Sequence, residues 1–149
     1  LRRSRGLGDV YKRQDYESSK GREMENNPNI SGLFFWPELH RQIRLEGVVS
    51  KTSDDVSDNY FASRPRGAQL SAIASSQSTE IEGRETVEDR IKELEIEFEG
   101  KDIPRPDNWG GYAIDISFWE FWQGRRSRTH DRFIYVKNDN SWEITRLSP

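Results

Sequence analysis

The chain has 149 residues, of which 33% are charged and 32% hydrophobic, and its formal net charge is −3. This length suits one domain with a real core, and five Trp, five Tyr and seven Phe argue against a disordered chain. The absence of cysteine excludes disulfides, thiolate metal sites and cysteine nucleophiles, and with only two histidines no multi-histidine metal site is expected. No apolar run approaches the roughly 18 residues of a membrane helix, so no segment is expected to span a membrane.

The first fourteen residues, LRRSRGLGDVYKRQ, differ in composition from the rest of the chain. They carry five basic residues and one acid, show no amphipathic stripe and do not begin with Met. An Arg-rich start can be a transit peptide or a basic arm, but this segment resembles a translated cloning-adaptor tail. We therefore predict a non-native tail over 1–14 and the domain over 15–149. Taking five positive charges and one negative charge from a net of −3 leaves −7, which disfavours a nucleic-acid-binding protein.

The first expected elements of the domain are a helix and two strands. Ser18 or Ser19 can cap a short helix that runs to Met24. The segment 30–36 is apolar on both faces, which is typical of a strand buried between layers. The segment 41–50 alternates enough to be its antiparallel neighbour.

Helical signals follow these strands. Ser53, which precedes two acids, predicts a helix that carries Tyr60 and Phe61 and ends near Arg64, just before a proline. The small residues of 67–78 predict a second short helix.

A longer amphipathic helix is expected to begin at Thr86. Its apolar stripe holds Val87, Ile91, Leu94 and Phe98. Thr86 and Asp89 can form a capping box, and Gly100 ends the helix. The glutamates between them predict a solvated face.

Four strands are expected in the rest of the chain, at about 111–116, 118–123, 129–137 and 142–147, with a turn at 138–140. The sequence therefore predicts an α+β domain, mainly antiparallel β, with peripheral helices.

Arg128, His130 and Arg132 occupy alternate positions just before and within the third of these strands, and as strand residues they would project from one face. Arginine forks match phosphate oxygens, and histidine can donate to an anion or pass a proton near neutral pH. The row is therefore a candidate anion site. The alternative is the solvent-exposed face of an edge strand, where charges discourage aggregation.

A series of motifs in order resembles one family, pyridoxamine 5′-phosphate oxidase, over about residues 15–149. The motifs are FFWPELHRQIRLEG, YFASRPRGAQLSA, SSQS, IPRPDNWGGY, EFWQG, RTHDRFIY and the closing RLSP. The chain enters the family pattern partway through, so we expect a C-terminal fragment in which the N-terminal part of the barrel is missing. Such a fragment is expected to expose sheet edge and apolar surface, and to be inactive or bind no flavin by itself.

The resemblance implies an FMN-binding split β-barrel, active as a cytoplasmic homodimer with no nucleic-acid or membrane partner. The cofactor contacts that it implies are Lys20, Gln42, Gln77, Ser78, Trp122 and Arg132. Cations suit a phosphate or a negatively charged reduced flavin, amides and hydroxyls suit polar groups, and an indole offers an aromatic wall.

For the substrate, the resemblance implies Tyr60 and Arg64 at the phosphate, with Arg128 and His130 over the pyridine ring and the reacting amine as the catalytic pair. Tyr60 and Arg64 are four residues apart and can share a helix face. Without the resemblance, Tyr60 reads as a core aromatic and Arg64 as a cation at a helix C-terminus. His40 matches no motif position and is expected at the surface.

Two positions depart from the family pattern. Ser19 stands where the family often has an Arg, and Ala68 stands where a Ser usually helps to hold the substrate phosphate. A neutral hydrogen bond is worth about 0.5–1.5 kcal/mol and a charge-assisted one up to about 3 kcal/mol, so we predict weaker binding rather than lost activity.

The activity implied is FMN-dependent oxidation of pyridoxamine 5′-phosphate or pyridoxine 5′-phosphate to pyridoxal 5′-phosphate, with oxygen as acceptor and hydrogen peroxide as product. The alternative from another class is a non-catalytic split-barrel protein that binds flavin or pyridoxal phosphate. Retention of Arg128 and His130 favours the oxidase. No metal is expected.

Overall fold

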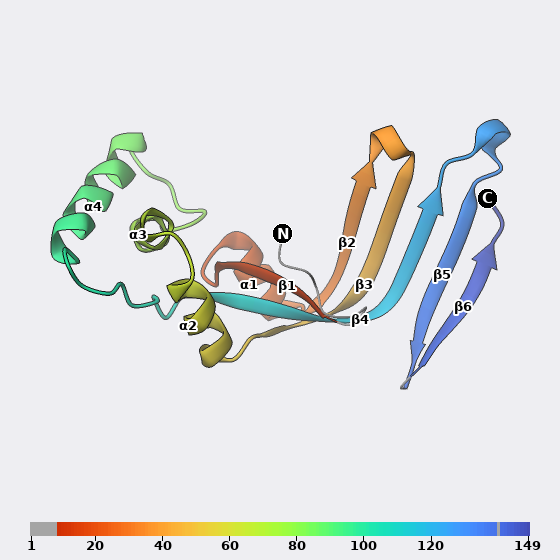
Figure 1. Cartoon of the computed structure of the whole chain (residues 1–149), viewed down its shortest axis with the longest axis horizontal. Coiled ribbons are helices and arrows are strands. Elements are labelled where there is room, and N and C mark those ends of the chain that lie inside the picture. Colours follow the sequence, from red (N-terminus) through yellow and green to blue (C-terminus); the bar gives the residue numbers. More distant parts are fainter. Residues whose placement is uncertain (1–8, 140) are drawn as a thin grey trace. The chain divides into compact units, whose positions relative to one another are not determined.

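The structure is a computed structural model that describes residues 9–139 and 141–149. Its elements in chain order are β1 (Asp9–Asp15), α1 (Ser19–Asn26), β2 (Asn29–Trp36), β3 (Arg41–Lys51), α2 (Asp54–Ala62), α3 (Arg66–Ala74), α4 (Arg84–Glu97), β4 (Trp109–Gln123), β5 (Asp131–Asn138) and β6 (Ser141–Leu147). Two 3₁₀ turns, Pro37–Leu39 and Arg126–Arg128, follow β2 and β4. The expected α+β class is confirmed (Figure 1).

The strands form a sheet in the order β2-β3-β4-β5-β6, and β1 also pairs with β4. The β2–β3, β4–β5 and β5–β6 pairs are antiparallel. The chain divides into two compact units. Within the described residues, the first unit comprises 9–10, 27–50 and 114–149, and the second comprises 11–26 and 51–113.

In the first unit, Leu45 and Val49 of β3 and Ile114 and Ile116 of β4 are buried, because alternate residues of each strand turn inward. Gly47 permits the close approach of these strands, since a Cβ there would stand 2.4 Å from the carbonyl oxygen of Asp115. Burying each large aliphatic side chain contributes about 1.5–3 kcal/mol.

In the second unit, the core gathers the residues Phe61, Leu70, Leu94, Ile103 and Trp109 from α2, α3, α4, the proline-containing segment and the start of β4. Gln69 of α3 is also buried and donates to the carbonyl oxygen of Phe61 at 2.9 Å. This bond satisfies one of the carbonyls at the C-terminal end of α2. The core therefore holds the end of α2 in place, and α2 carries Tyr60.

Several sequence expectations are corrected. Strand β1 includes residues 9–14, which were expected to lie outside the fold; residues 1–8 lie outside the described residues, and a non-native origin stays a prediction. The expected strands 111–116 and 118–123 are one strand, β4, because burial alternates through Ser117 without a turn residue. The fifth strand begins at Asp131 rather than at residue 129.

The expected capping box of the long helix is wrong. Gly83 is the N-cap of α4, and Thr86 lies inside the first turn. The helix begins earlier because Arg84 forms an i,i+4 ion pair with Glu88, which supports an added turn.

The strand β2 was expected to be buried on both faces, but its apolar side chains are exposed. Leu33 is 60% exposed and Phe35 is 57% exposed, with Phe34 and Trp36 also open to solvent. β2 also lies at one end of the strand order and pairs only with β3 among the described strands, so its other backbone edge is open as well. The expected exposure of apolar surface is thus observed here.

Candidate cofactor and substrate site

One face of the sheet in the first unit carries three of the predicted cofactor contacts. Trp122 of β4 pairs directly with Arg132 of β5, so the two side chains share a face. Glu120 precedes Trp122 by two residues and lies on that face as well. An ion pair joins Glu120 to Arg44 of β3, which places Gln42, two residues before Arg44, on the same face.

Glu120 is buried and holds two guanidiniums. Its Oε1 accepts from Nε and Nη2 of Arg132, both at 2.8 Å, and its Oε2 lies 3.4 Å from Nη2 of Arg44. Nη1 of Arg132 donates to the carbonyl oxygen of Ser148 at 3.3 Å. Such charge-assisted pairs fix a guanidinium in one orientation. The family resemblance implies no role for Glu120, although an acid inside an apolar strand, two residues from an aromatic contact, is a visible signal in the sequence.

Arg128 and His130 are not strand residues, contrary to the alternation expected of them. Arg126–Arg128 form a 3₁₀ turn, and Ser127 and Arg128 have φ of 55° and 62°. The turn breaks the strand period, so Arg128 does not share a row with Arg132. His130 still returns to the sheet face, because its ring lies 4.8 Å from the Trp122 ring between centroids, at an interplanar angle of 41°.

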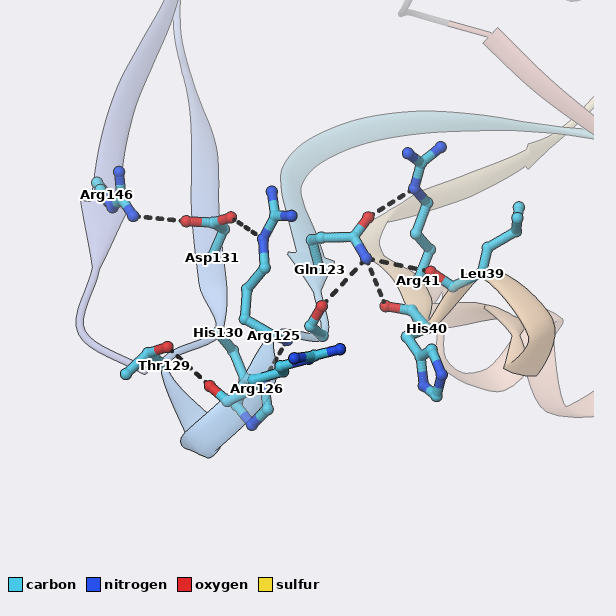
Figure 2. Close-up of polar contacts among 11 residues, drawn as sticks. Leu39, His40, Arg41, Gln123, Arg125, Arg126, Thr129, His130, Asp131 and Arg146 are labelled. Atoms are coloured by element: carbon cyan, nitrogen blue, oxygen red, sulfur yellow. Dashed lines mark hydrogen bonds and ion pairs between the residues drawn. The ribbon is translucent and has the colours of Figure 1, made fainter.

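A hydrogen-bond network fixes the segment around His130 (Figure 2). The backbone N–H of Arg125 donates to Nδ1 of His130 at 3.1 Å. The Asp131 carboxylate accepts from Nε of Arg125 at 2.7 Å and from Nη2 of Arg146 at 2.5 Å. The hydrogen bond from Arg125 lowers the pKa of Asp131 below its ordinary value, with both arginine charges acting in the same direction and desolvation opposing them.

Gln123 ties β4 to the turn after β2 (Figure 2). Its side chain accepts from Nε of Arg41 at 2.7 Å and donates to the carbonyl oxygens of Leu39 and His40. His40 is exposed, as expected, and has a left-handed φ of 48°.

A cavity of about 420 Å³ opens beside this network within the first unit. Its lining includes the predicted contacts Gln42 and Trp122 together with Gln123, Arg125 and Asp131. Aromatic and apolar walls with a few polar groups are typical of small-molecule sites.

In the second unit, Tyr60 and Arg64, which are predicted to bind the substrate phosphate, both contact the indole of Trp109. The Tyr60 ring stacks on it at 6.2 Å and 5°, and the guanidinium carbon of Arg64 lies 4.8 Å from its centroid. Arg64 lies two residues beyond the end of α2, so the two residues meet through Trp109 rather than on one helix face. Nη1 of Arg64 is buried and has no hydrogen-bond partner among the residues described. A buried donor without a partner is costly unless a ligand satisfies it.

Arg105 links α2 to the backbone of Trp109. Its side chain is 9% exposed and donates to Asp58 at 2.5 Å, to Asp54 at 2.8 Å and to the carbonyl oxygen of Trp109 at 2.7 Å. The hydrogen bond to Asp58 is the main cause that raises the pKa of Arg105. Arg105 could not be predicted from the sequence, because acids one turn apart in α2 do not indicate a distant partner.

The remaining predicted contacts lie elsewhere in the second unit. Lys20 is exposed in α1, and Gln77 and Ser78 lie in the loop after α3, where Ser78 has a φ of 67°. The backbone N–H of Gln77 lies 3.4 Å from the buried carboxylate of Asp15. Ser19 is the first residue of α1 and Ala68 lies in the first turn of α3, so the two departures from the family pattern occupy helix starts.

Neither a metal-binding cluster nor a membrane-spanning helix is found in the described part of the chain. No group of three or more His, Cys, Asp or Glu side chains there could hold a metal ion. None of its helices is both long enough and apolar enough to cross a membrane.

Two family models match the chain. Residues 9–97 match the model described as pyridoxamine 5′-phosphate oxidase, and residues 109–149 match the pyridoxine 5′-phosphate oxidase C-terminal dimerisation region. Curated relatives named pyridoxine/pyridoxamine 5′-phosphate oxidase include that of Flavobacterium johnsoniae, 53% identical over 90% of this chain and 63% of that protein. That of Rubrobacter xylanophilus is 50% identical over 91% of this chain and 62% of that protein. The chain thus spans less than two thirds of the length of these relatives.

Two solved structures share the fold. PhzG from Burkholderia lata, in complex with tetrahydrophenazine-1-carboxylic acid, superposes with a TM-score of 0.88 at 30% identity, over 99% of this chain and 72% of that one. A pyridoxamine 5′-phosphate oxidase-related, FMN-binding protein from Nostoc punctiforme superposes with a TM-score of 0.72 at 15% identity, over 95% of this chain and 73% of that one. The expected split-barrel type of fold is confirmed.

Proposed function

This chain belongs to the pyridoxamine 5′-phosphate oxidase family, and from that premise we propose that it forms part of an FMN-dependent oxidase. The substrate is pyridoxamine 5′-phosphate or pyridoxine 5′-phosphate, the product is pyridoxal 5′-phosphate, and oxygen is reduced to hydrogen peroxide. The single observation that carries this proposal is the shared sheet face of Gln42, Trp122 and Arg132, with the His130 ring against Trp122.

The residues of that face fit FMN chemically. Arg132 is a fixed cation suited to a phosphate or a reduced flavin, Gln42 offers an amide, and Trp122 offers an aromatic wall. Lys20, Gln77 and Ser78 complete the proposed cofactor set. When bound, FMN supplies the two-electron chemistry of the oxidation.

The phosphate of the substrate is proposed to bind at Tyr60 and Arg64. Trp109 holds both side chains, and the buried Nη1 of Arg64 is a donor that an anionic oxygen would satisfy. This is the observation that favours a phosphorylated substrate over a neutral one.

Arg128 and His130 are proposed to orient the substrate and stabilise charge at the reacting carbon. The 3₁₀ turn presents Arg128 to solvent, and the contact with Trp122 holds the His130 ring beside the proposed flavin wall. We further propose a homodimer, which agrees with the match to a dimerisation region. A cytoplasmic location stays a prediction.

The test uses the longest reading frame that contains this chain, purified with FMN. Bound flavin is measured by absorbance, and peroxide release is measured with pyridoxamine 5′-phosphate, pyridoxine 5′-phosphate and unphosphorylated pyridoxine. Peroxide with the two phosphorylated substrates is the expected result. Flavin binding without peroxide release would favour the alternative, a non-catalytic protein that binds flavin or pyridoxal phosphate. Equal rates with unphosphorylated pyridoxine would contradict the proposed role of Arg64 in binding the substrate phosphate.

A second candidate function comes from PhzG, whose structure contains tetrahydrophenazine-1-carboxylic acid. An oxidase acting on a tricyclic carboxylate could also use Arg64 for its anion. Identity of 50–53% with the vitamin B6 enzymes, against 30% with PhzG, favours the first proposal. Peroxide release with a reduced phenazine carboxylate, and none with the phosphorylated pyridines, would reverse this preference.

A further inference from the structure

His130 accepts a hydrogen bond at one defined ring nitrogen. The backbone N–H of Arg125 points at Nδ1 of the imidazole, 3.1 Å away (Figure 2). A backbone N–H can only donate, so Nδ1 must carry a lone pair. In a neutral imidazole the proton then resides on Nε2.

The donor is itself held in place from two sides. On the side-chain side, Nε of Arg125 donates to Asp131, which also accepts from Arg146 of β6. On the backbone side, the turn closes through Thr129, whose N–H and hydroxyl both donate to the carbonyl oxygen of Arg126. Residues 125 and 130 are therefore fixed at the two ends of one short turn.

Asp131 lies at the centre of this arrangement. Arg125, which precedes the turn, and Arg146, which lies on the neighbouring strand β6, contact different oxygens of the same carboxylate. Since β5 and β6 are paired from Arg132 to Asn138, Arg146 is fixed relative to the sheet. The carboxylate therefore ties the start of the turn to the sheet, and with it the N–H that bonds His130.

We propose that Asp131 is a positioning residue which, through Arg125, fixes His130 as the Nε2–H tautomer. Resting on the proposed function, this has a chemical consequence: neutral His130 meets the substrate as a hydrogen-bond donor at Nε2 and not as a proton acceptor at Nδ1. The side chain of Asp131 does not touch the substrate in this proposal. It acts through the geometry of the turn.

The test is ¹⁵N NMR of the imidazole rings at about pH 8, where an ordinary imidazole is neutral. The chain has two histidines, so a His40→Asn variant assigns His130, and Asn tolerates the left-handed backbone of that position. The expected spectrum shows a bare Nδ1 and a protonated Nε2. A protonated Nδ1 would overturn the proposal.

Asp131→Asn is then expected to move the two ring ¹⁵N shifts toward each other, because the second tautomer becomes populated. Arg125→Met, which keeps the N–H and removes the ion pair, should shift them in the same direction. The matched control is Asp115→Asn, which removes the exposed pair between Asp115 and Lys137 in the same unit. Unchanged ring shifts in both test variants would refute the role of Asp131, and shifts of the same size in the control would do so as well.

The readout is independent of activity. A protein with the expected tautomer but no peroxide release would contradict the proposed function and leave the tautomer assignment standing. An active protein with a protonated Nδ1 would contradict only the assignment.

Discussion

The ring of His130 lies 4.8 Å from the ring of Trp122, so the aromatic wall proposed for the flavin also supports the imidazole proposed for the substrate. The two residues come from different segments, β4 and the turn before β5. A change in either one should therefore alter both binding events.

Trp122→Leu is expected to weaken FMN binding by about 2- to 12-fold, since an aromatic pair is worth about 0.5–1.5 kcal/mol beyond area burial. Flavin fluorescence titration measures the effect. Trp142→Leu on β6 removes another half-buried indole that lies opposite Lys137, and serves as control. Equal weakening by both substitutions would show that Trp122 has no specific role.

Arg64→Met should raise KM for the phosphorylated substrate about 10- to 100-fold with a smaller effect on flavin content, because a charge-assisted bond is worth about 1.5–3 kcal/mol. Steady-state peroxide assays give both parameters. Arg66→Met is the control, since Arg66 donates to the carbonyl oxygens of Lys101 and Phe98 and not to a proposed ligand. An unchanged KM in Arg64→Met would remove this residue from the phosphate site.

Arg105→Leu should destabilise the protein by about 1.5–3 kcal/mol and raise KM for the phosphate, because the clamp on α2 and Trp109 is lost. Urea unfolding and the KM measurement are made on the same preparation. Arg84→Leu breaks an exposed helix pair and should change stability by less than about 1 kcal/mol. A destabilised Arg105→Leu protein with wild-type KM would limit Arg105 to stability alone.

Glu120→Gln should lower the free energy of unfolding by about 1.5–3 kcal/mol and weaken FMN binding, because a buried carboxylate that orients Arg132 loses its charge. Glu46→Gln provides a matched comparison, since exposed Glu46 contacts the same Arg44 at 3.6 Å. That change should be worth about 0.5 kcal/mol or less. Similar losses in the two variants would contradict the special position of Glu120.

The free energy of unfolding at acid pH should depend on the protonation of Asp131. Its folded-state pKa is lowered, chiefly by the hydrogen bond from Arg125, so the unfolded chain takes up the proton first as pH falls. The contribution is therefore present above the ordinary carboxyl value of 3.8 and is lost as pH falls through the lowered folded pKa. An NMR titration of the Asp131 carboxyl carbon should give a midpoint below that ordinary value, and a midpoint at or above it would contradict the network.

The sequence predicted the elements well where the signal is local. Ser53 proved to be the N-cap of α2, and the periodicity of segment 41–50 corresponds to β3. Partnerships over long sequence distances could not be predicted: nothing near Arg105 indicates that it bonds residues about fifty positions earlier. The predicted position of Arg128 on a strand face is wrong, because the chain makes a turn at Arg126–Arg128. After Gly124 no glycine or proline in the sequence indicates that turn.

The site residues divide in the same way. The resemblance identified Gln42, Trp122 and Arg132, and the sheet places these three on one face. Glu120, which fixes Arg132, and Asp131, which fixes Arg125, have no predicted role, since neither an acid in a strand nor one after a histidine is informative without its arginine partners.

Ser127 and Arg128 are adjacent and both have a left-handed backbone, but only Arg128 is proposed to contact the substrate. A non-glycine residue with positive φ carries strain on the order of 1 kcal/mol, which glycine relieves. Ser127→Gly would relieve it without removing a proposed ligand contact. The same change at Arg128 would relieve similar strain only by deleting the guanidinium proposed to orient the substrate, so turn stability and substrate binding favour different residues at adjacent positions.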